Sequence, residues 1–274
     1  MPEPIDVGSA AILGAVQGAT EFLPVSSSGH VALTSMLLGV SADMPLSMVV
    51  LLHFGTLVAT IAVFAKDLRS LTASTVDGLK GGPRAWLDTD AGRVVAGVVL
   101  ASVPTAIIGL ALEERVEEFS KVSWIVGLGL LGSAAVVLST KRGGGQQESL
   151  TLGKALIVGV AQGIAVLPGV SRSGTTIAVA MLLGMSGPAA FRFSFLLSLP
   201  AVAGATLLSM RHTDELAALG TAGVVGGVVS AIVGLAALLW LRALVDRGRF
   251  WTFAVYLVPL GLGLVSYQLY TVMT

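Results

Sequence analysis

Six long apolar stretches constrain the fold of this chain more than any other feature of its sequence. Each is close to the ~20 residues that an α-helix needs to cross the hydrocarbon core of a bilayer. Because only helices and closed barrels satisfy their backbone groups in lipid, the pattern predicts an all-α, polytopic membrane protein with six transmembrane helices. The stretches lie at about 45–65, 94–112, 122–140, 188–209, 216–241 and 250–272.

The composition agrees with a membrane protein and excludes several other classes. Of the 274 residues, 54% are hydrophobic and 12% are charged, whereas soluble domains carry about 25% charged residues. Sixteen basic residues balance sixteen acidic ones, so the chain lacks the positive field on which nucleic-acid binding depends. We therefore expect no nucleic-acid partner. The chain has no cysteine, which excludes disulfides, thiolate metal sites and cysteine nucleophiles.

Two further apolar regions, 7–40 and 152–186, are each interrupted in the middle by a polar motif. The first motif is PVSSSGH at 24–30, and the second is PGVSRSG at 168–174. Interrupted backbone is tolerated at membrane depth only where protein or a water-filled cavity satisfies its peptide groups. We therefore expect two re-entrant helix pairs, each returning to the face from which it entered. The alternative is two ordinary spans in each region.

The two interrupted regions are copies of each other. A shift of 145 residues aligns 14–41 with 159–186, and 12 of the 28 pairs are identical. The chain is thus predicted to be one membrane domain, 1–274, built from repeat 1 at about 7–140 and repeat 2 at about 152–272. Because each repeat would cross the membrane three times, the second copy enters from the opposite face. This is an inverted-topology repeat, in which two broken helix pairs build a site between them.

The basic residues of the connecting segments predict an orientation. In this topology the segments 66–93, 141–154 and 242–249 share one face and carry eleven Lys and Arg residues, against three on the opposite face. Since basic residues concentrate in cytoplasmic loops, both termini and the first helix pair are expected to face outward. The glycine-containing segments 66–93 and 143–147 are expected to be solvated linkers.

The first helix pair contains a carboxylate and several hydroxyl groups. Glu21 is the only acidic residue of region 7–40, and ionisable groups at membrane depth are functional candidates. Gln17 lies one helical turn earlier, on the same face. The run Ser26-Ser27-Ser28 is expected to begin the returning helix, where serines cap N–H groups and anions bind. Ser27 and His30 are three residues apart, the spacing of a nucleophile and base on one helical face.

The second helix pair supplies the opposite charge. Arg172 occupies the position that matches Ser27, between Ser171 and Ser173, with Thr175 and Thr176 following. A guanidinium in a membrane demands an anionic partner, and its fork suits phosphate oxygens. A structural salt bridge with Glu21 is the alternative. His53 could equally be a packing residue or part of the site.

These motifs closely resemble those of the membrane-embedded undecaprenyl-diphosphate phosphatases, the bacitracin-resistance family. VQGATEFLPVSSSGH at 16–30 resembles that family's Glu/Gln-x-x-x-Glu segment with its following serines and His, and LPGVSRSGTT at 167–176 resembles its second signature. FRFSFLLSLPAV at 191–202 and RFWTFAVYLVPLG at 249–261 are similar to later segments of the family. The likeness extends over essentially the whole chain.

The resemblance implies a hydrolase that converts undecaprenyl diphosphate to undecaprenyl phosphate and inorganic phosphate, recycling the carrier lipid for peptidoglycan synthesis. Its location would be the cytoplasmic (inner) membrane of a bacterium. The resemblance also implies a divalent cation, Mg²⁺ or Ca²⁺, with Glu21 as its ligand. Gln17 stands where the family often has a second Glu, which removes one negative charge from any metal site. Met48 stands in place of an expected Asp, which makes a role for His53 less certain.

The reactive set implied by the resemblance is Glu21, Ser27, His30 and Arg172. We expect Ser27, helped by His30 or Glu21, to attack the terminal phosphorus of a diphosphate that Arg172 and a cation hold. Alternatively, Ser27 only positions an attacking water. The residues expected to bind the diphosphate are Gln17, Ser26, Ser28, Ser171, Ser173 and Thr176.

Two other classes of function compete with a phosphatase. Inverted repeats with broken helices are common in carriers, so a polyprenyl-phosphate transporter or flippase is the main alternative. A purely structural membrane subunit would leave the buried Glu21 and Arg172 unexplained. The expected partners are a polyprenyl diphosphate and membrane lipid, and a homodimer is left open.

Overall fold

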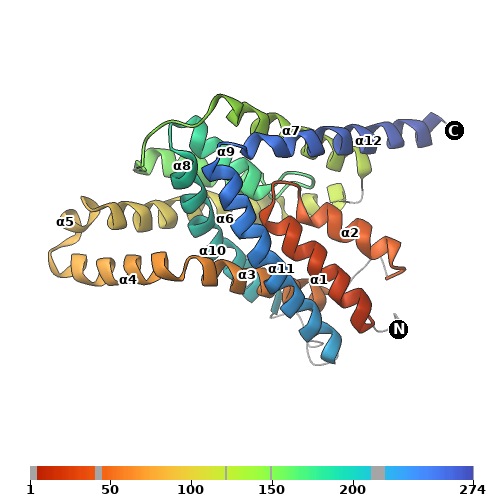
Figure 1. The fold of residues 1–274 in the computed structure, drawn as a ribbon, viewed down its shortest axis with the longest axis horizontal. Helices are drawn as coiled ribbons and strands as arrows, with labels where there is room; N and C mark the ends of the chain where they lie inside the picture. The colour runs from red at the N-terminus through yellow and green to blue at the C-terminus, as the bar shows by residue number, and fades with distance from the viewer. Residues whose placement is uncertain (1–4, 41–44, 121, 149, 211–219, 274) are drawn as a thin grey trace.

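The computed structural model is an all-α assembly that describes residues 5–40, 45–120, 122–148, 150–210 and 220–273 (Figure 1). No strand occurs within these ranges. Six helical segments are long and apolar enough to cross a membrane, which confirms the six predicted spans. They are α3 (Leu46–Val63), α6 (Asp90–Ser120), α7 (Ser123–Ser139) with η1 (Thr140–Arg142), α10 (Gly187–Met210), α11 (Gly220–Asp246), and η3 (Phe250–Phe253) with α12 (Ala254–Met273).

Large apolar side chains cover the outside of these helices. Ile107 on α6, Val224 on α11 and Val255 on α12 are 62%, 64% and 69% exposed. In water such a surface would be a strong aggregation site, whereas against lipid tails it has no cost. The protein is a multi-pass membrane protein, and its core lies where the helices face one another.

Each interrupted region forms two short helices that pack against each other. The first region gives α1 (Val7–Phe22) and α2 (Ser27–Leu37), and the second gives α8 (Leu152–Ile164) and α9 (Arg172–Leu182). The breaks lie at the PVSSSGH and PGVSRSG motifs, as the sequence predicts. That each pair returns to its own face of the membrane stays a prediction, because helix length and composition alone do not place the bilayer.

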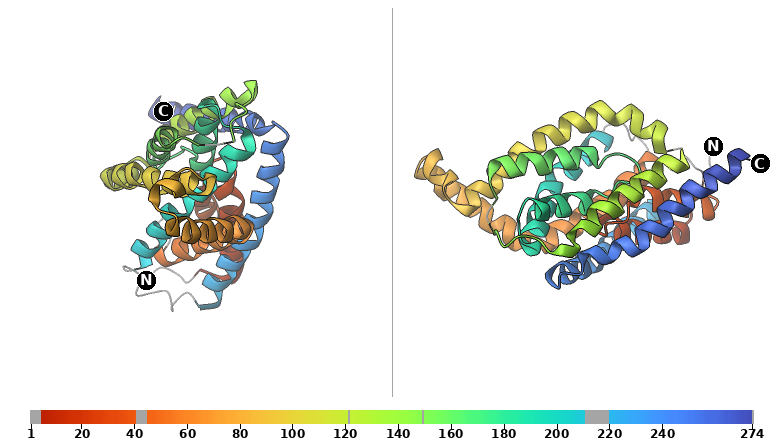
Figure 2. Two further views of the ribbon diagram at one scale, coloured as in Figure 1. Left: turned by 90° about the vertical axis from the view of Figure 1, so that its left-hand side faces the viewer. Right: turned by 90° about the horizontal axis from the view of Figure 1, so that it is seen from above.

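The helix contacts follow the sequence repeat. Helix α1 of the first half packs on α11 of the second, and its counterpart α8 packs on α6 of the first half. In the same way α3 contacts α11 while α10 contacts α6, and α7 runs beside α12 (Figure 2). Such reciprocal contacts are what a two-fold relation between two copies produces. Each half therefore depends on the other for its packing.

One expected linker has a regular structure. Residues 66–93 were predicted to be solvated, but they form α4 (Ala65–Lys80), α5 (Pro83–Leu87) and the start of α6. Leu68 and Leu71 face the core from α4 at helical spacing, so this helix is amphipathic rather than unstructured. The chain turns at Gly82, whose φ is +96°. The α4–α5 hairpin projects at the end of the molecule opposite the start of α1 and the end of α12 (Figure 1).

The second expected linker also has specific contacts. The backbone N–H of Gln147 donates to the Gly184 carbonyl at 3.2 Å, and the N–H of Ser186 donates to the Gln147 carbonyl at 3.0 Å. Segment 143–147 therefore lies against the turn between α9 and α10. The sequence could not indicate this pairing, because it joins residues almost forty positions apart.

Two glycines let the halves approach closely. A Cβ on Gly14 in α1 would lie 2.3 Å from the Gly226 carbonyl oxygen in α11, and one on Gly159 in α8 would lie 2.2 Å from the Ala101 carbonyl oxygen in α6. Small residues permit such crossings in membranes. The hydroxyl of Thr105 adds a hydrogen bond to the Gly159 carbonyl at 2.8 Å. These crossings set how near the two polar motifs come.

A substitution pair on α8 tests this packing. Gly159→Ala should destabilise the protein by about 1–3 kcal/mol, the usual cost of overpacking, because the helices must move apart. Gly153→Ala on the same helix meets nothing within 4 Å and should be neutral or stabilising by up to about 1 kcal/mol. Thermal unfolding in detergent measures both variants. Equal melting temperatures for the two would contradict the close crossing.

Candidate active site

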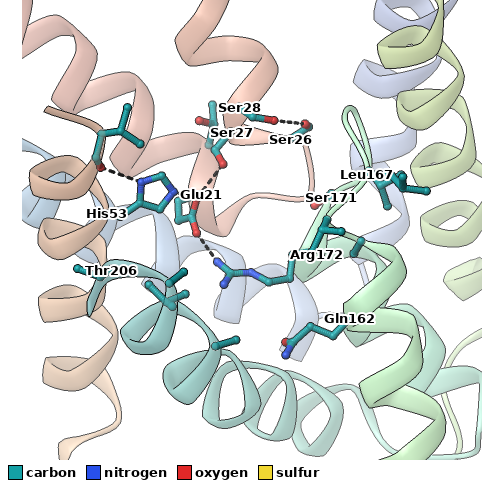
Figure 3. Close-up of a pocket in the computed structure, with 18 of the residues that line it drawn as sticks. Glu21, Ser26, Ser27, Ser28, His53, Gln162, Leu167, Ser171, Arg172 and Thr206 are labelled. Carbon is teal, nitrogen blue, oxygen red and sulfur yellow. Dashed lines mark hydrogen bonds and ion pairs between the residues drawn. The ribbon is translucent and has the colours of Figure 1, made fainter. Parts of the chain in front are cut away.

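The two interrupted motifs meet at a cavity of about 330 Å³ between the two halves (Figure 3). Side chains from α1, α2, α3, α6, α8, α9 and α10 and from the loop before α9 line it. One part of the lining is apolar: Val49, Val50, Ala165, Val166, Leu167, Val170, Ala201, Val202 and Ala205. The rest is polar: Thr20, Glu21, Ser26, Ser27, Ser28, His53, Thr105, Gln162, Ser171, Arg172, Thr206 and Ser209.

The ion pair between Glu21 and Arg172 lies at the centre of the cavity. The side chain of Glu21 is 6% exposed and that of Arg172 is 26% exposed. One Arg172 amino group, Nη2, donates to Glu21 Oε1. Glu21 lies in the last turn of α1 in the first half, and Arg172 begins α9 in the second. A charge at this depth must be paired, so the pair joins the two halves.

The other carboxylate oxygen of Glu21 holds two further groups. The Ser27 hydroxyl donates to Glu21 Oε2 at 2.7 Å, and Gln17 Nε2 donates to the same oxygen at 3.1 Å. Figure 3 shows Ser27, Glu21 and Arg172 in a row across the cavity. Among the described residues, Ser27 is the only serine whose hydroxyl donates to this carboxylate. A serine hydroxyl bonded to a carboxylate is the arrangement that nucleophilic catalysis by serine requires.

The backbone at Ser26 is strained. Its φ of +68° is the only positive value outside glycine in the described ranges, and such conformations concentrate at functional sites. Ser26 precedes α2 but its side chain makes no capping hydrogen bond; its hydroxyl lies 3.5 Å from that of Ser28. The first N–H groups of α2 therefore have no cap from the Ser26 side chain. They lie at the end of the helix that borders the cavity, and helix N-termini of this kind bind anions.

The structure does not bring His30 to Ser27. His30 Nδ1 lies 2.8 Å from the Ser26 carbonyl, and Nε2 lies 2.7 Å from the Tyr256 hydroxyl on α12. The carbonyl only accepts, so Nδ1 carries a proton and helps to hold the strained turn. His30 does not line the cavity. Its role as the base for Ser27 stays a prediction that this geometry does not support.

The imidazole that does line the cavity is His53. Its Nδ1 donates to the Val49 carbonyl at 2.9 Å, and its Nε2 lies 3.9 Å from Glu21 Oε2. The sequence left His53 undecided because its neighbour Met48 departed from the expected acid. Met48 is fully buried and packs with Ala10 and Leu13 of α1, whereas His53 lines the cavity.

The second motif is held by α7 and by its own side chains. The backbone N–H of Ser171 donates to the Ser133 hydroxyl at 2.8 Å, and Ser171 Oγ caps α9 by accepting from the Gly174 N–H at 3.1 Å. The Thr176 hydroxyl pairs with that of Ser194 at 2.5 Å. Of the residues predicted to bind the diphosphate, Ser26, Ser28 and Ser171 line the cavity, whereas Gln17, Ser173 and Thr176 lie behind it.

The donor set does not fit a resident divalent cation. The described residues contain no group of three or more His, Asp or Glu side chains that could hold a metal ion. Glu21 contributes one negative charge, and Arg172 already balances it. Mg²⁺ and Ca²⁺ require about six oxygen ligands, and Gln17 brings no second carboxylate. Any cation would need most of its ligands from the substrate and from water.

Several cavity residues escape sequence reasoning. Thr105, Thr206 and Ser209 lie within apolar spans and carry no pattern. Gln162 has one signal, because it is the repeat partner of Gln17, but that match served only to define the repeat.

The comparisons identify the family. The family model described as "Bacitracin resistance protein BacA" matches residues 10–263. The chain belongs to this family. Three similar relatives each carry the name "Undecaprenyl-diphosphatase". One is from Korarchaeum cryptofilum, 40% identical over 96% of this chain and 99% of its own. Another is from Desulfosudis oleivorans, 41% identical over 94% and 96%. The third is from Trichlorobacter lovleyi, 41% identical over 96% and 97%.

The buried ion pair makes a prediction about stability that is independent of activity. Glu21→Gln or Arg172→Gln alone strands one charge, which costs about 3–5 kcal/mol for a fully buried pair. We expect less here because a quarter of the Arg172 side chain is exposed. The double variant removes both charges and should be more stable than either single variant. Unfolding of the wild type, the two single variants and the double variant in detergent gives the coupling energy between the two side chains. Losses of stability that simply add in the double variant would contradict a coupled pair.

Proposed function

We propose that this BacA-family protein dephosphorylates undecaprenyl diphosphate to undecaprenyl phosphate and inorganic phosphate. The observation that carries the proposal is the row Ser27–Glu21–Arg172 in a cavity that is partly polar and partly apolar. Such a cavity suits a diphosphate head attached to an isoprenoid tail. The names of the relatives favour this activity over a flippase. The product would return to peptidoglycan synthesis as the lipid carrier.

The polar groups would bind and neutralise the diphosphate. Arg172 has five N–H donors, and one N–H on Nη2 donates to Glu21. Its remaining donors, the uncapped start of α2 and the hydroxyls of Ser26, Ser28 and Ser171 would surround the phosphoryl oxygens. The apolar wall from Val49 to Ala205 would take the first isoprene units. The rest of the tail would stay in the bilayer between the spans.

The chemical step would begin at Ser27. Its oxygen bonds to the terminal phosphorus as its proton passes to Glu21 Oε2, and the bridging P–O bond breaks to release undecaprenyl phosphate. Water then attacks the phosphoserine, and Ser27 leaves with the proton held by Glu21. Phosphoryl transfer depends mainly on positioning and on charge neutralisation, which Arg172 and the helix ends supply. In the alternative, Ser27 positions the water for direct attack.

A divalent cation, Mg²⁺ or Ca²⁺, would enter as a complex with the diphosphate, with Glu21 as its nearest protein ligand. The protein's own donors are too few for a resident ion, so no step above depends on one. We further propose that the protein lies in the cytoplasmic membrane, with the basic segments inside and the site open to the outer side. One chain carries both halves of the site, so catalysis would not need a homodimer.

Phosphate release tests the proposed activity. Purified wild-type protein should release inorganic phosphate from a polyprenyl diphosphate, and Ser27→Ala should lower the rate at least about 100-fold through loss of the nucleophile. Ser102→Ala is the matched control, because that hydroxyl bonds only within α6, to the Val98 carbonyl. A denaturing trap with labelled terminal phosphate should capture phospho-Ser27. If Ser27 only positions water, no label will be trapped.

A folded wild-type protein that releases no phosphate in several lipids and cations would overturn the proposal. Movement of phosphorylated lipid between leaflets of a vesicle, without phosphate release, would favour the carrier.

A second carboxylate should create the missing metal ligand. Gln17→Glu would place two acids one helical turn apart. In the wild-type protein Gln17 Nε2 lies 3.1 Å from Glu21 Oε2, so the two carboxylates of the variant would be close neighbours. We expect tighter cation binding without substrate, measured as a cation-dependent rise in melting temperature of the variant and not of the wild type. The like charges should also destabilise the variant when chelator is present. A wild-type protein with an equally large cation-dependent shift would show that a resident site exists.

A further inference from the structure

The side-chain amide of Gln162 has an unused acceptor in the cavity. Gln162 comes from α8, is 2% exposed and lines the same cavity as Glu21 and Arg172. Its Oε1 is buried and has no hydrogen-bond partner. Such an atom is costly unless a water or ligand satisfies it. Figure 3 shows Gln162 below Arg172, with its amide group pointing away from α8.

The repeat shows how Gln162 differs from its copy in the first half. Gln162 is the copy of Gln17, whose amide is bonded to Glu21. The same shift of 145 residues places Val166 where Glu21 stands in the first half. The second half therefore keeps the amide and lacks its carboxylate partner. The amide Nε2, which bonds the carboxylate in the first half, bonds Thr105 in the second, and Oε1 has no partner.

Thr105 fixes which end of the amide faces the cavity. Gln162 Nε2 lies 3.4 Å from the Thr105 hydroxyl oxygen. That hydroxyl has one proton, which it directs to the carbonyls of Ala101 and Gly159 at 2.9 and 2.8 Å. It can therefore only accept from Gln162. Turning the amide over would set two acceptors against each other, so the donor stays with Thr105 and Oε1 stays toward the cavity.

An acceptor cannot bind the oxygens of a phosphate, because they are acceptors too. It can bind a water molecule, which donates to it and keeps a lone pair for attack. We propose that Gln162 Oε1 holds and orients the water that attacks phosphorus; this rests on the proposed function. Gln162 is thus a positioning residue on the water side of the reaction. Ser27 and Glu21 of the first half line the same cavity as Gln162.

In the hydrolytic step, the water oxygen bonds to phosphorus and the bond from phosphorus to Ser27 Oγ breaks. Ser27 takes back the proton from Glu21, and both water protons leave on dihydrogen phosphate. If water attacks the diphosphate directly, the same acceptor orients it while the bridging P–O bond breaks. In either route the rate of phosphoryl transfer to water depends on Gln162, whereas the binding of the lipid does not depend on this residue.

Competition between water and methanol tests this role. Methanol attacking phosphorus gives methyl phosphate instead of inorganic phosphate. In Gln162→Leu, which keeps the bulk and lacks the acceptor, kcat should fall about tenfold, as for the loss of one hydrogen bond in the transition state. KM should be unchanged, and the ratio of methyl phosphate to inorganic phosphate should rise.

A structural control separates positioning from packing. Ser230→Ala removes a fully buried hydroxyl that donates to the Leu52 carbonyl at 2.8 Å, outside the cavity, and should leave the product ratio unchanged. An unchanged ratio in a folded Gln162→Leu protein would overturn the inference. Failure of the wild type to release either product would instead overturn the proposed function, so the two failures are distinguishable.

Discussion

The ion pair between Glu21 and Arg172 is the interaction on which the rest of the site depends. Each charge would be costly alone among apolar helices, and each comes from a different half of the chain. The pair can form only when α1 and α9 have met, so the site is assembled by the same packing that joins the halves. Ser27 is bonded to the same carboxylate. The Ser27 hydroxyl therefore takes this position beside Arg172 only in the complete fold.

Duplication supplies the scaffold, and divergence supplies the chemistry. Both halves provide a broken helix pair whose second helix begins at the polar motif. At matching positions, however, the side chains differ: Ser27 is matched by Arg172, Glu21 by Val166 and His30 by Thr175. Two identical halves would set like charges against each other across the cavity. The active arrangement thus requires a symmetric backbone with asymmetric residues.

The sequence predicts what depends on composition and local spacing, and it misses what depends on distant contacts. Hydropathy identified the six spans, and the motifs identified Glu21, Ser27 and Arg172. The three-residue spacing suggested that His30 serves Ser27, but Tyr256, 226 residues away, holds the ring elsewhere. The α4–α5 hairpin was missed because its apolar face is narrow. Gln162 offered only its repeat match with Gln17, since the orientation of its amide is defined by Thr105 on another helix.

The division of the cavity into polar and apolar parts matches the two parts of the proposed substrate. A polyisoprenoid tail would stay in the bilayer, so its diphosphate would have to react while the tail lies among the helices. Small side chains on α10, Ala201 and Ala205, leave room beside the reactive groups. Thr206, one residue further along α10, returns a hydroxyl to the polar part. A fold with two broken helix pairs meets both needs, because the ends of the short helices bring N–H donors and charged groups next to apolar side chains in one cavity.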